Sequence, residues 1–100
     1  MAYVRMFMTA LDPADADKIQ EIVDDDVKPV FREFACRSVD LLVSSEPNAG
    51  GLVDGCILSR WDSLEELNAA VSSAPIVDAV QRLRGLLRQE PVTRIYEVID

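Results

Sequence analysis

Four segments of the chain carry apolar residues in the pattern of β-strands, and they cover residues 3–9, 36–45, 52–60 and 91–99. In the first segment apolar residues occur at both parities, which is typical of a strand that is covered on both faces. The second and third segments are joined by Glu-Pro-Asn-Ala-Gly-Gly at residues 46–51. Because this connection is rich in turn-forming residues, the pair is predicted to form a hairpin.

The chain from residue 12 to residue 34 shows the spacing of an α-helix. Asp12 can cap the first free N–H groups, and Pro13 suits the first helical turn. The apolar stripe that follows has intervals of three and four residues and consists of Ala16, Ile19, Val23, Val27, Val30 and Phe34. Pro29 interrupts this helix, and because proline lacks an N–H and clashes with the preceding turn, we expect a kink near Val27 and Lys28.

A second helical region follows the third strand and is predicted to be split. Ser63 and Glu66 have the spacing of a capping box, which marks a helix start. Ser-Ser-Ala-Pro at residues 72–75 breaks the apolar stripe, and a second helical segment runs over residues 76–88.

The element order is strand, helix, strand, strand, helix, strand. Two right-handed crossovers around a central hairpin give an α+β fold of the ferredoxin-like βαββαβ type. The expected sheet is antiparallel and ordered fourth, first, third and second strand, with the helices on one face. The length of 100 residues fits a single domain over residues 1–100.

The helices can cover only one face of this sheet. We expect the helix side to carry Val4, Met6, Met8, Val39, Leu41, Val43, Ile57, Ile95 and Ile99. The other face is then expected to carry Tyr3, Arg5, Phe7, Asp40, Leu42, Asp54, Cys56, Leu58, Arg60, Arg94 and Tyr96. Large apolar patches seldom stay exposed on a monomer, so a second sheet is expected to pack on this face.

Composition narrows the classes of function. The chain has 18 acidic and 10 basic residues, a formal net charge of −8 and no histidine. The acidic charge disfavours nucleic acid as a partner, and imidazole is absent as a base or metal ligand. No apolar stretch approaches the roughly 20 residues of a membrane span, and the first residues lack the pattern of a secretory signal. A cytoplasmic protein without a membrane partner is expected.

The two cysteines are predicted to stay reduced and apart. They form no CxxC motif. In a hairpin closed around residues 47–51, Cys36 would lie opposite a residue near 60 and too far from Cys56 for a bridge.

Several segments carry a family resemblance. The opening Tyr3–Met8, the first helix with Pro29, the hairpin that leads into Arg60–Leu67 and the closing strand that ends in Tyr96–Val98 resemble the antibiotic-biosynthesis-monooxygenase family of the dimeric α/β-barrel superfamily. The resemblance implies a homodimer whose two sheets close a barrel. It also implies a pocket within the barrel or between a sheet and its helices. Members of this family include cofactor-free oxygenases of polycyclic phenols and haem-degrading enzymes.

The chain departs from the haem-degrading members. Those enzymes hold iron through a histidine near the second helix and use an asparagine near the end of the first strand. This chain has no histidine and carries Thr9–Leu11 at that strand end. We therefore expect no haem. No other cofactor is expected, and no metal either, because the consecutive residues Asp24, Asp25 and Asp26 would point in different directions on a helix. The quinone-forming relatives use a tryptophan and tyrosines near an asparagine, and the available residues here are Trp61, Tyr3, Tyr96 and Asn68.

The candidate substrate-binding residues are Trp61, Tyr3, Arg5, Phe7, Arg60, Tyr96 and Arg94. Each has a structural alternative. Trp61 can anchor the core, the arginines can pair with Asp40 and Asp54 across strands, and the tyrosines can lie in an interface. Because no acid–base pair is identified, the catalytic residues stay unassigned.

The sequence thus leaves two functions open. The first is a homodimeric, cofactor-independent monooxygenase-like protein that acts on or binds a small aromatic or phenolic molecule. The alternative is a non-catalytic homodimer with a ligand-binding or structural role. Aromatic walls favour flat rings, and an unpaired arginine favours an anionic group. The ligand is therefore expected to be apolar or aromatic with at most one anionic group.

Overall fold

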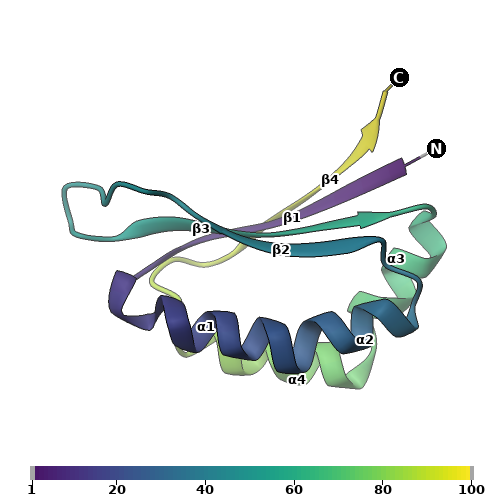
Figure 1. Ribbon diagram of the computed structural model, residues 1–100, viewed down its shortest axis with the longest axis horizontal. Helices are drawn as coiled ribbons and strands as arrows, with labels where there is room; N and C mark the ends of the chain where they lie inside the picture. The colour runs from purple at the N-terminus through teal and green to yellow at the C-terminus, as the bar shows by residue number, and fades with distance from the viewer. Residues whose placement is uncertain (1, 100) are drawn as a thin grey trace.

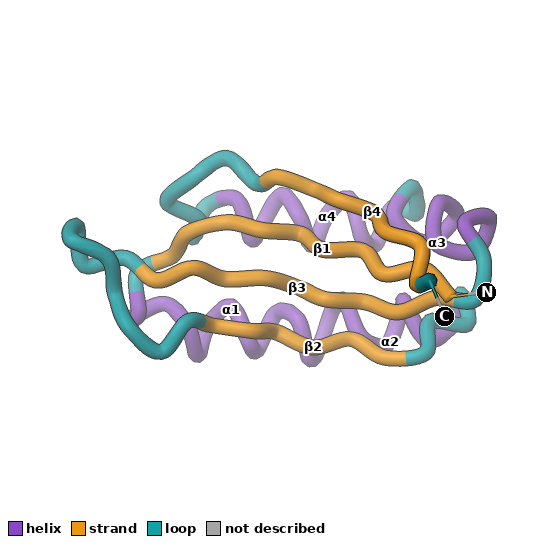
Figure 2. The backbone as a smooth tube through the Cα atoms, turned by 90° about the horizontal axis from the view of Figure 1, so that it is seen from above, coloured by secondary structure: helices purple, strands orange, loops and turns teal. Residues whose placement is uncertain are grey.

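The computed structural model describes residues 2–99 and contains a four-stranded antiparallel sheet (Figure 1). The strands are β1 (Ala2–Leu11), β2 (Ser38–Val43), β3 (Val53–Trp61) and β4 (Val92–Val98). They lie in the order β2-β3-β1-β4, which Figure 2 shows from above. Read from the other edge, this is the predicted order of fourth, first, third and second strand. The ferredoxin-like α+β fold is therefore confirmed.

A single layer of helices covers one face of the sheet and leaves the opposite face open (Figure 1). The first crossover contains η1 (Pro13–Asp15), α1 (Ala16–Ile22), η2 (Val23–Val27) and α2 (Lys28–Glu33). The second crossover contains α3 (Leu64–Val71) and α4 (Ala74–Arg84). The predicted split of the second helix is confirmed. Ser63 caps α3 by accepting a hydrogen bond from the Glu66 backbone N–H at 3.1 Å.

The kink predicted near Pro29 takes the form of a wide helical turn. The segment η2 is π-helical, and the Lys28 N–H that follows it donates to the Val23 carbonyl. The wide turn relieves the clash that the Pro29 ring would make with the carbonyl of the preceding α-helical turn. The buried residues of this crossover are Ile19, Val23, Val27 and Phe31. Val30 and Phe34, which belong to the predicted stripe, are only half-buried against the core.

The segment after α4 closes one end of the sheet. α4 ends at Arg84 instead of extending to residue 88, because the following residues pair with β1. Leu87 forms an isolated β-bridge with Leu11, and the Arg88 N–H donates to the Ala10 carbonyl at 2.8 Å.

The hydrophobic core lies between the sheet and the helices. From the sheet it includes Phe7, Ile57 and Trp61. Cross-strand partners lie on the same face of a sheet, and Phe7 pairs with Ile57 while Tyr3 pairs with Trp61. The odd-numbered residues of β1 therefore face the helices.

This arrangement corrects the predicted faces of the first strand. Val4, Met6 and Met8 were expected on the helix side, but they lie on the open face, where Met6 pairs with Leu58 and Met8 with Cys56. Tyr3, Arg5 and Phe7, which were expected on the open face, lie on the helix side. Because β1 carries apolar residues at both odd and even positions, its sequence does not show which set of side chains faces the helices.

The faces of the other strands agree with the prediction. Leu41 pairs with Ile57 on the helix side, and Asp40 pairs with Leu58 on the open face. Ile99, which was expected on the helix side, follows the end of β4 and is exposed.

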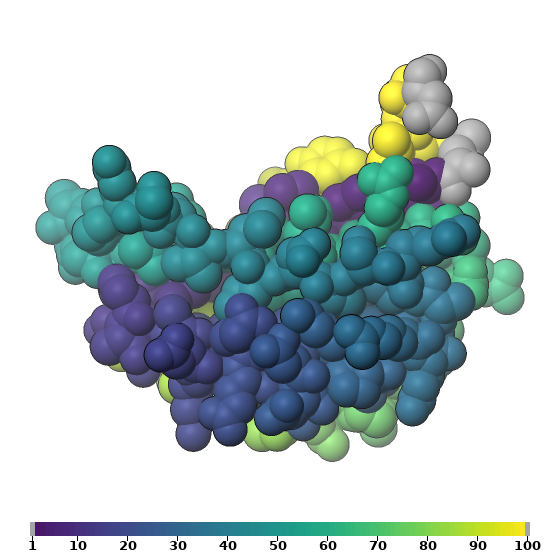
Figure 3. Space-filling view, in the orientation of Figure 1, coloured from purple at the N-terminus to yellow at the C-terminus, as the bar shows by residue number. Residues whose placement is uncertain are grey.

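The open face is concave. At one end the β2–β3 hairpin rises above the sheet, and at the other end the last residues of β4 rise with the start of β1 (Figures 1 and 3). Within residues 2–99, no helix is long and apolar enough to cross a membrane.

Candidate functional site

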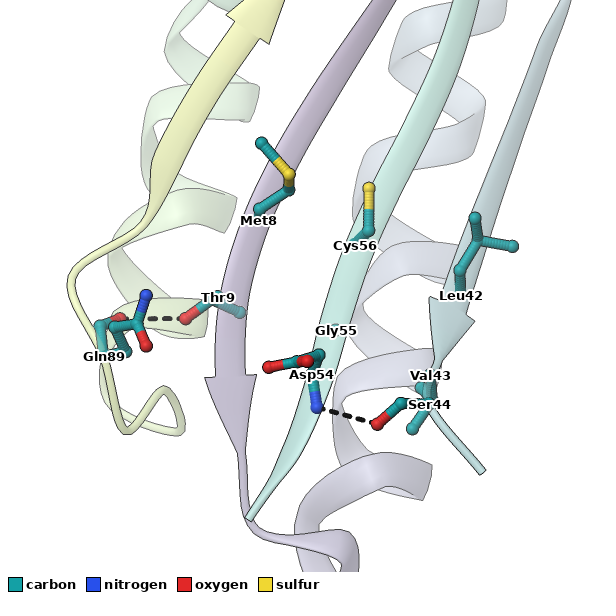
Figure 4. A pocket seen from close by; sticks show the side chains of 9 residues that line it. All are labelled: Met8, Thr9, Leu42, Val43, Ser44, Asp54, Gly55, Cys56 and Gln89. Carbon is teal, nitrogen blue, oxygen red and sulfur yellow. Dashed lines mark hydrogen bonds between the residues drawn. The ribbon is translucent and has the colours of Figure 1, made fainter. Parts of the chain in front are cut away.

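The open face holds a groove of about 440 Å³ at the end near the β2–β3 hairpin (Figure 4). Residues from β1, β2, β3 and the segment after α4 line it: Met8, Thr9, Leu42, Val43, Ser44, Asp54, Gly55, Cys56 and Gln89. Cys56 pairs with Met8 on one side and with Leu42 on the other, so these three form one row across the sheet. This row gives the groove an apolar wall.

Polar groups gather at one end of the groove. The Thr9 hydroxyl donates to the Gln89 carbonyl at 2.8 Å, and the Asp54 N–H donates to the Ser44 hydroxyl at 2.9 Å. The Ser44 N–H in turn donates to the Asp54 carbonyl at 2.9 Å. These bonds fix the backbone around Asp54, and its carboxylate is directed from β3 toward β1 (Figure 4).

The space between the sheet and the helices is filled with side chains. The cavity there measures about 10 Å³ and is lined by apolar residues that include Phe7, Ile19, Ile57 and Leu83. A single water needs about 10–15 Å³. Of the two pocket positions that the resemblance implies, only the open face therefore has room for an aromatic molecule in this conformation.

Trp61 lies in the core, below the sheet. Its side chain is fully buried and meets Phe31 edge to face, with ring centroids 5.1 Å apart. The indole Nε1 donates to the Ser59 hydroxyl at 2.9 Å. This geometry is that of a core anchor, the first of the two roles considered for Trp61. Contact between Trp61 and a ligand stays a prediction.

Three other candidates lie on the helix side of β1. Phe7 is buried in the core, and Tyr3 is half-buried against it. The Arg5 guanidinium lies 5.5 Å from the centroid of the Phe7 ring, which is a cation–π distance. Burial lowers the pKa of Arg5 from its ordinary value.

The remaining candidates, Arg60, Arg94 and Tyr96, lie on the open face. Arg60 and Tyr96 flank Val4 in one row, and Arg94 pairs with Met6 in the next row. All three are exposed and lie outside the lining of the groove. The candidate residues thus fall into two groups on opposite faces of the sheet.

The expected pairing of arginines with Asp40 and Asp54 is absent. Among the residues that the structure describes, neither aspartate forms an ion pair. The groove lining contains no lysine or arginine either. Asp54 therefore presents an uncompensated carboxylate to the groove.

Both cysteines are free. The hairpin pairs Ser38 with Arg60 and Leu42 with Cys56, so Cys36 and Cys56 are separated as predicted. Burial raises the pKa of both thiols. A thiol with a raised pKa is a poor nucleophile at neutral pH, which gives neither cysteine an activated character.

No metal centre is formed within the described part of the chain. There, no group of three histidine, cysteine, aspartate or glutamate side chains could hold an ion.

Sequence reasoning placed Leu42, Asp54 and Cys56 on the open face but did not assign them to a site. Met8 was missed because the faces of β1 were reversed. Gln89 had no sequence signal, because it reaches the groove through the pairing of the segment after α4 with β1.

No protein-family model and no curated protein matches the chain. Solved structures match it along nearly its whole length. A protein from Caulobacter crescentus, provisionally named an antibiotic biosynthesis monooxygenase, has a TM-score of 0.79 and 15% identity, with 99% of this chain and 91% of that chain covered. One of the same provisional name from Nitrosomonas europaea has a TM-score of 0.76 and 12% identity, with 98% and 90% covered.

Rv0793 from Mycobacterium tuberculosis has a TM-score of 0.75 and 19% identity, with 100% of this chain and 97% of that chain covered. This chain has the antibiotic-biosynthesis-monooxygenase-like fold. The resemblance noted from the sequence is confirmed at the level of this fold, which extends over the sheet, both crossovers and the closing strand.

Proposed function

We propose that the protein is a homodimeric, cofactor-independent monooxygenase-like protein that binds a small aromatic or phenolic molecule on the open face of its sheet. The observation that carries this proposal is the groove of about 440 Å³ with an apolar wall and a few polar groups at one end. Pockets for small molecules usually measure about 300–1,000 Å³ and combine these two features.

The other hollows of the molecule suit an aromatic ligand less well. A hollow of about 500 Å³ lies on the outer side of the helices and is lined mainly by charged residues, namely Lys18, Glu21, Asp25, Asp26 and Arg82. Arg82 and Asp26 form an ion pair there at 2.8 Å. An aromatic ring could contact Ile22 and Leu86 there, but it would also have to displace water from these charges.

The apolar character of the open face supports a second copy as its cover. Leu42 and Tyr96 are 47% and 51% exposed, and Met6, Met8 and Leu58 lie between them in the sheet. Stable dimers bury about 1,200–2,000 Å² or more in total. A partner on this face would also cover the mouth of the groove and exclude water from a bound ligand.

The provisional names of the structural neighbours support oxygenase chemistry as the activity to test. A cofactor-free oxygenase holds an electron-rich ring away from bulk water while the ring reacts with oxygen. A phenol whose hydroxyl donates to a carboxylate gains electron density on its ring, and Asp54 offers such a carboxylate.

A non-catalytic binding protein is the second candidate. It is favoured by the composition of the groove, whose lining holds one carboxylate, Asp54, and one thiol, Cys56, but no histidine, lysine or arginine. General acid–base catalysis normally needs a positioned pair of groups that exchange protons.

Three measurements test the proposal. Sedimentation at micromolar concentration is expected to give twice the chain mass of 11.1 kDa. A thermal-shift screen with phenols and hydroxyquinones is expected to give hits, because a ligand at 100 times its Kd adds about 2.7 kcal/mol of stability. Oxygen uptake and product analysis by mass spectrometry then separate catalysis from binding alone.

A matched pair of substitutions locates the ligand. Met8→Trp fills the groove and is expected to abolish the thermal shift. Met6→Trp places the same ring on the same face one row away, outside the groove, and is expected to leave the shift in place. Binding that survives Met8→Trp unchanged would move the ligand to another site. Trp61→Ala is a poorer test, since emptying a buried tryptophan site costs about 3–5 kcal/mol of stability.

A further inference from the structure

The hydrogen-bonding groups at the polar end of the groove indicate which polar group a ligand should carry, which the volume of the groove does not. If the proposed function holds, the side chains that face a bound molecule there are those of Asp54 and Gln89, with Ser44 beside them. Thr9 belongs to the odd-numbered row of β1 that faces the helices, and it is only 8% exposed. The existing hydrogen bonds of these side chains decide which groups are left to recognise a ligand.

Most of the groups at this end can only accept a hydrogen bond from a ligand. The Thr9 hydroxyl proton is already committed to the Gln89 carbonyl at 2.8 Å, so Thr9 has no proton to donate to a ligand. The Asp54 carboxylate forms no hydrogen bond or ion pair among the described residues, and all its lone pairs are open. At this polar end the Ser44 hydroxyl donates to the Glu46 carbonyl at 3.4 Å, so the side-chain amide of Gln89 is the side chain there with free protons to donate. The Cys56 thiol on the apolar wall is a weak donor.

The charge of the groove points the same way. On the strands of the open face, Arg94 pairs with Met6, one row away from Met8, and Arg60 pairs with Val4, two rows away, and neither lines the groove. A carboxylate ligand would therefore meet Asp54 without a cation between them. Like charges in a partly dehydrated site repel, whereas a donor placed on a carboxylate forms a strong hydrogen bond.

We infer that Asp54 selects ligands whose polar group donates a hydrogen bond, such as a phenolic hydroxyl or an ammonium, and rejects aromatic carboxylates. This inference rests on the proposed function, because it names the class of molecule that the same groove accepts. It also replaces the expectation that an unpaired arginine favours an anionic group on the ligand, since Arg5 lies on the helix side and Arg60 and Arg94 lie outside the groove.

Calorimetric titration with three probes of one shape tests the inference. Naphthol, naphthylmethylammonium and naphthoate share a ring system and differ in the polar group. The wild-type dimer is expected to bind the first two at least about tenfold more tightly than naphthoate, a difference of about 1.4 kcal/mol. The difference in affinity between naphthylmethylammonium and naphthoate is expected to become smaller at high salt, because ions screen a charge pair in an open groove.

Asp54→Asn and Asp40→Asn form a matched pair. Asp54 makes its hydrogen bonds through its backbone, so the asparagine variant keeps the hairpin intact. Asp54→Asn is expected to remove the difference in affinity between naphthylmethylammonium and naphthoate, and to tighten naphthoate binding about tenfold. Asp40 lies on the same face, opposite Leu58 and outside the groove. Asp40→Asn is therefore expected to change neither the affinity for naphthylmethylammonium nor the affinity for naphthoate.

The outcomes separate the two proposals. Tight binding of naphthoate to the wild type, or an unchanged order of the probes in Asp54→Asn, overturns the inference and leaves the groove as the ligand site. Failure of all three probes to bind the wild type overturns the proposed function, and the inference with it.

Discussion

At the scale of single residues, two close contacts of sheet residues limit the substitutions that the fold tolerates. Gly55 lies in β3 where the side chain of Leu11 crosses it, and a Cβ built on Gly55 would overlap Leu11 Cδ2. Leu11 is 1% exposed, and the cavity of about 10 Å³ that it lines beside Gly55 is smaller than a methyl group, so its side chain can move aside only by displacing core neighbours. Packing therefore favours glycine at this point, although its backbone conformation is one that other residues adopt.

Gly55→Ala is expected to lower the free energy of unfolding by about 1–3 kcal/mol, the usual cost of overpacking a core. In a domain of this size, thermal denaturation should show a fall in Tm of about 4–8 °C for each kcal/mol. Gly85→Ala is the control. Gly85 has a φ of −65° and the added Cβ would lie 3.5 Å from the Arg82 carbonyl oxygen, so stability should hold or rise by about 0.4–1 kcal/mol. Equal losses in both variants would contradict the packing argument.

The second contact is the hydrogen bond from Trp61 Nε1 to the Ser59 hydroxyl, both fully buried. Ser59→Ala leaves the indole N–H without a partner and is expected to cost about 1–3 kcal/mol. Trp61→Phe removes the donor as well as part of the ring. The double variant should therefore be more stable than the sum of the two single losses, as a double-mutant cycle by urea unfolding would show. Strict additivity would mean that this bond contributes nothing.

At the scale of elements, the strands, the hairpin and the split second helix follow from local patterns. Turn residues between residues 46 and 51, the Ser63 cap and the proline breaks are all short-range signals, and the structure contains each of them. The wrong predictions concern features that depend on contact with a second element. The face of β1 that turns toward the helices is set by its pairing with Ile57 and Trp61, and no pattern within β1 reveals it.

The candidate site shows the same division. Leu42 and Cys56 could be placed on the open face because their strands alternate clearly between apolar and polar positions. The groove itself depends on the curvature of the sheet and on the docking of Gln89 beside Thr9, which are tertiary features. Phe31 was missed as a core residue for a similar reason, since the π-helical turn shifts the buried stripe by one position.

The cap of α3 gives a prediction at this scale. Ser63→Ala removes the acceptor for the Glu66 N–H and is expected to cost about 1 kcal/mol, with a range of about 0.5–2 kcal/mol. Ser45→Ala, at an exposed loop position, is the control and should stay within about 0.5 kcal/mol of the wild type. Chemical denaturation of both variants measures the difference, and similar values for the two would show that the cap is not used.

At the scale of the whole molecule, the two cysteines report separately on the proposed dimer. Cys56 lies on the open face, whereas Cys36 lies in the connection between α2 and β2. Burial raises the pKa of both thiols, so the reactive thiolate fraction is small at neutral pH and grows as pH rises toward the raised values. Each should thus react with iodoacetamide more slowly than an unfolded cysteine.

Leu58→Asp places a charge in the centre of the open face and is expected to split the dimer in sedimentation. In that variant the labelling rate of Cys56 should rise by about tenfold or more, while the rate of Cys36 should not change. Leu64→Asp is the control, because Leu64 is equally a leucine but lies exposed at the start of α3 on the helix side. A wild type that already labels Cys56 as fast as Leu58→Asp does would refute the covered face.

The wide turn before Pro29 also has a consequence for the length of the chain. It spaces the buried residues Ile19, Val23, Val27 and Phe31 evenly by four, whereas an ordinary helix favours alternating intervals of three and four. Deleting Asp25 restores the ordinary intervals, but it also brings Pro29 against the preceding turn at a cost of about 3 kcal/mol. The deletion combined with Pro29→Ala should then unfold in urea within about 1 kcal/mol of the wild type, and the deletion alone should not. The extra residue in the wide turn and Pro29 therefore depend on each other, and each is expected to be tolerated only when the other is present.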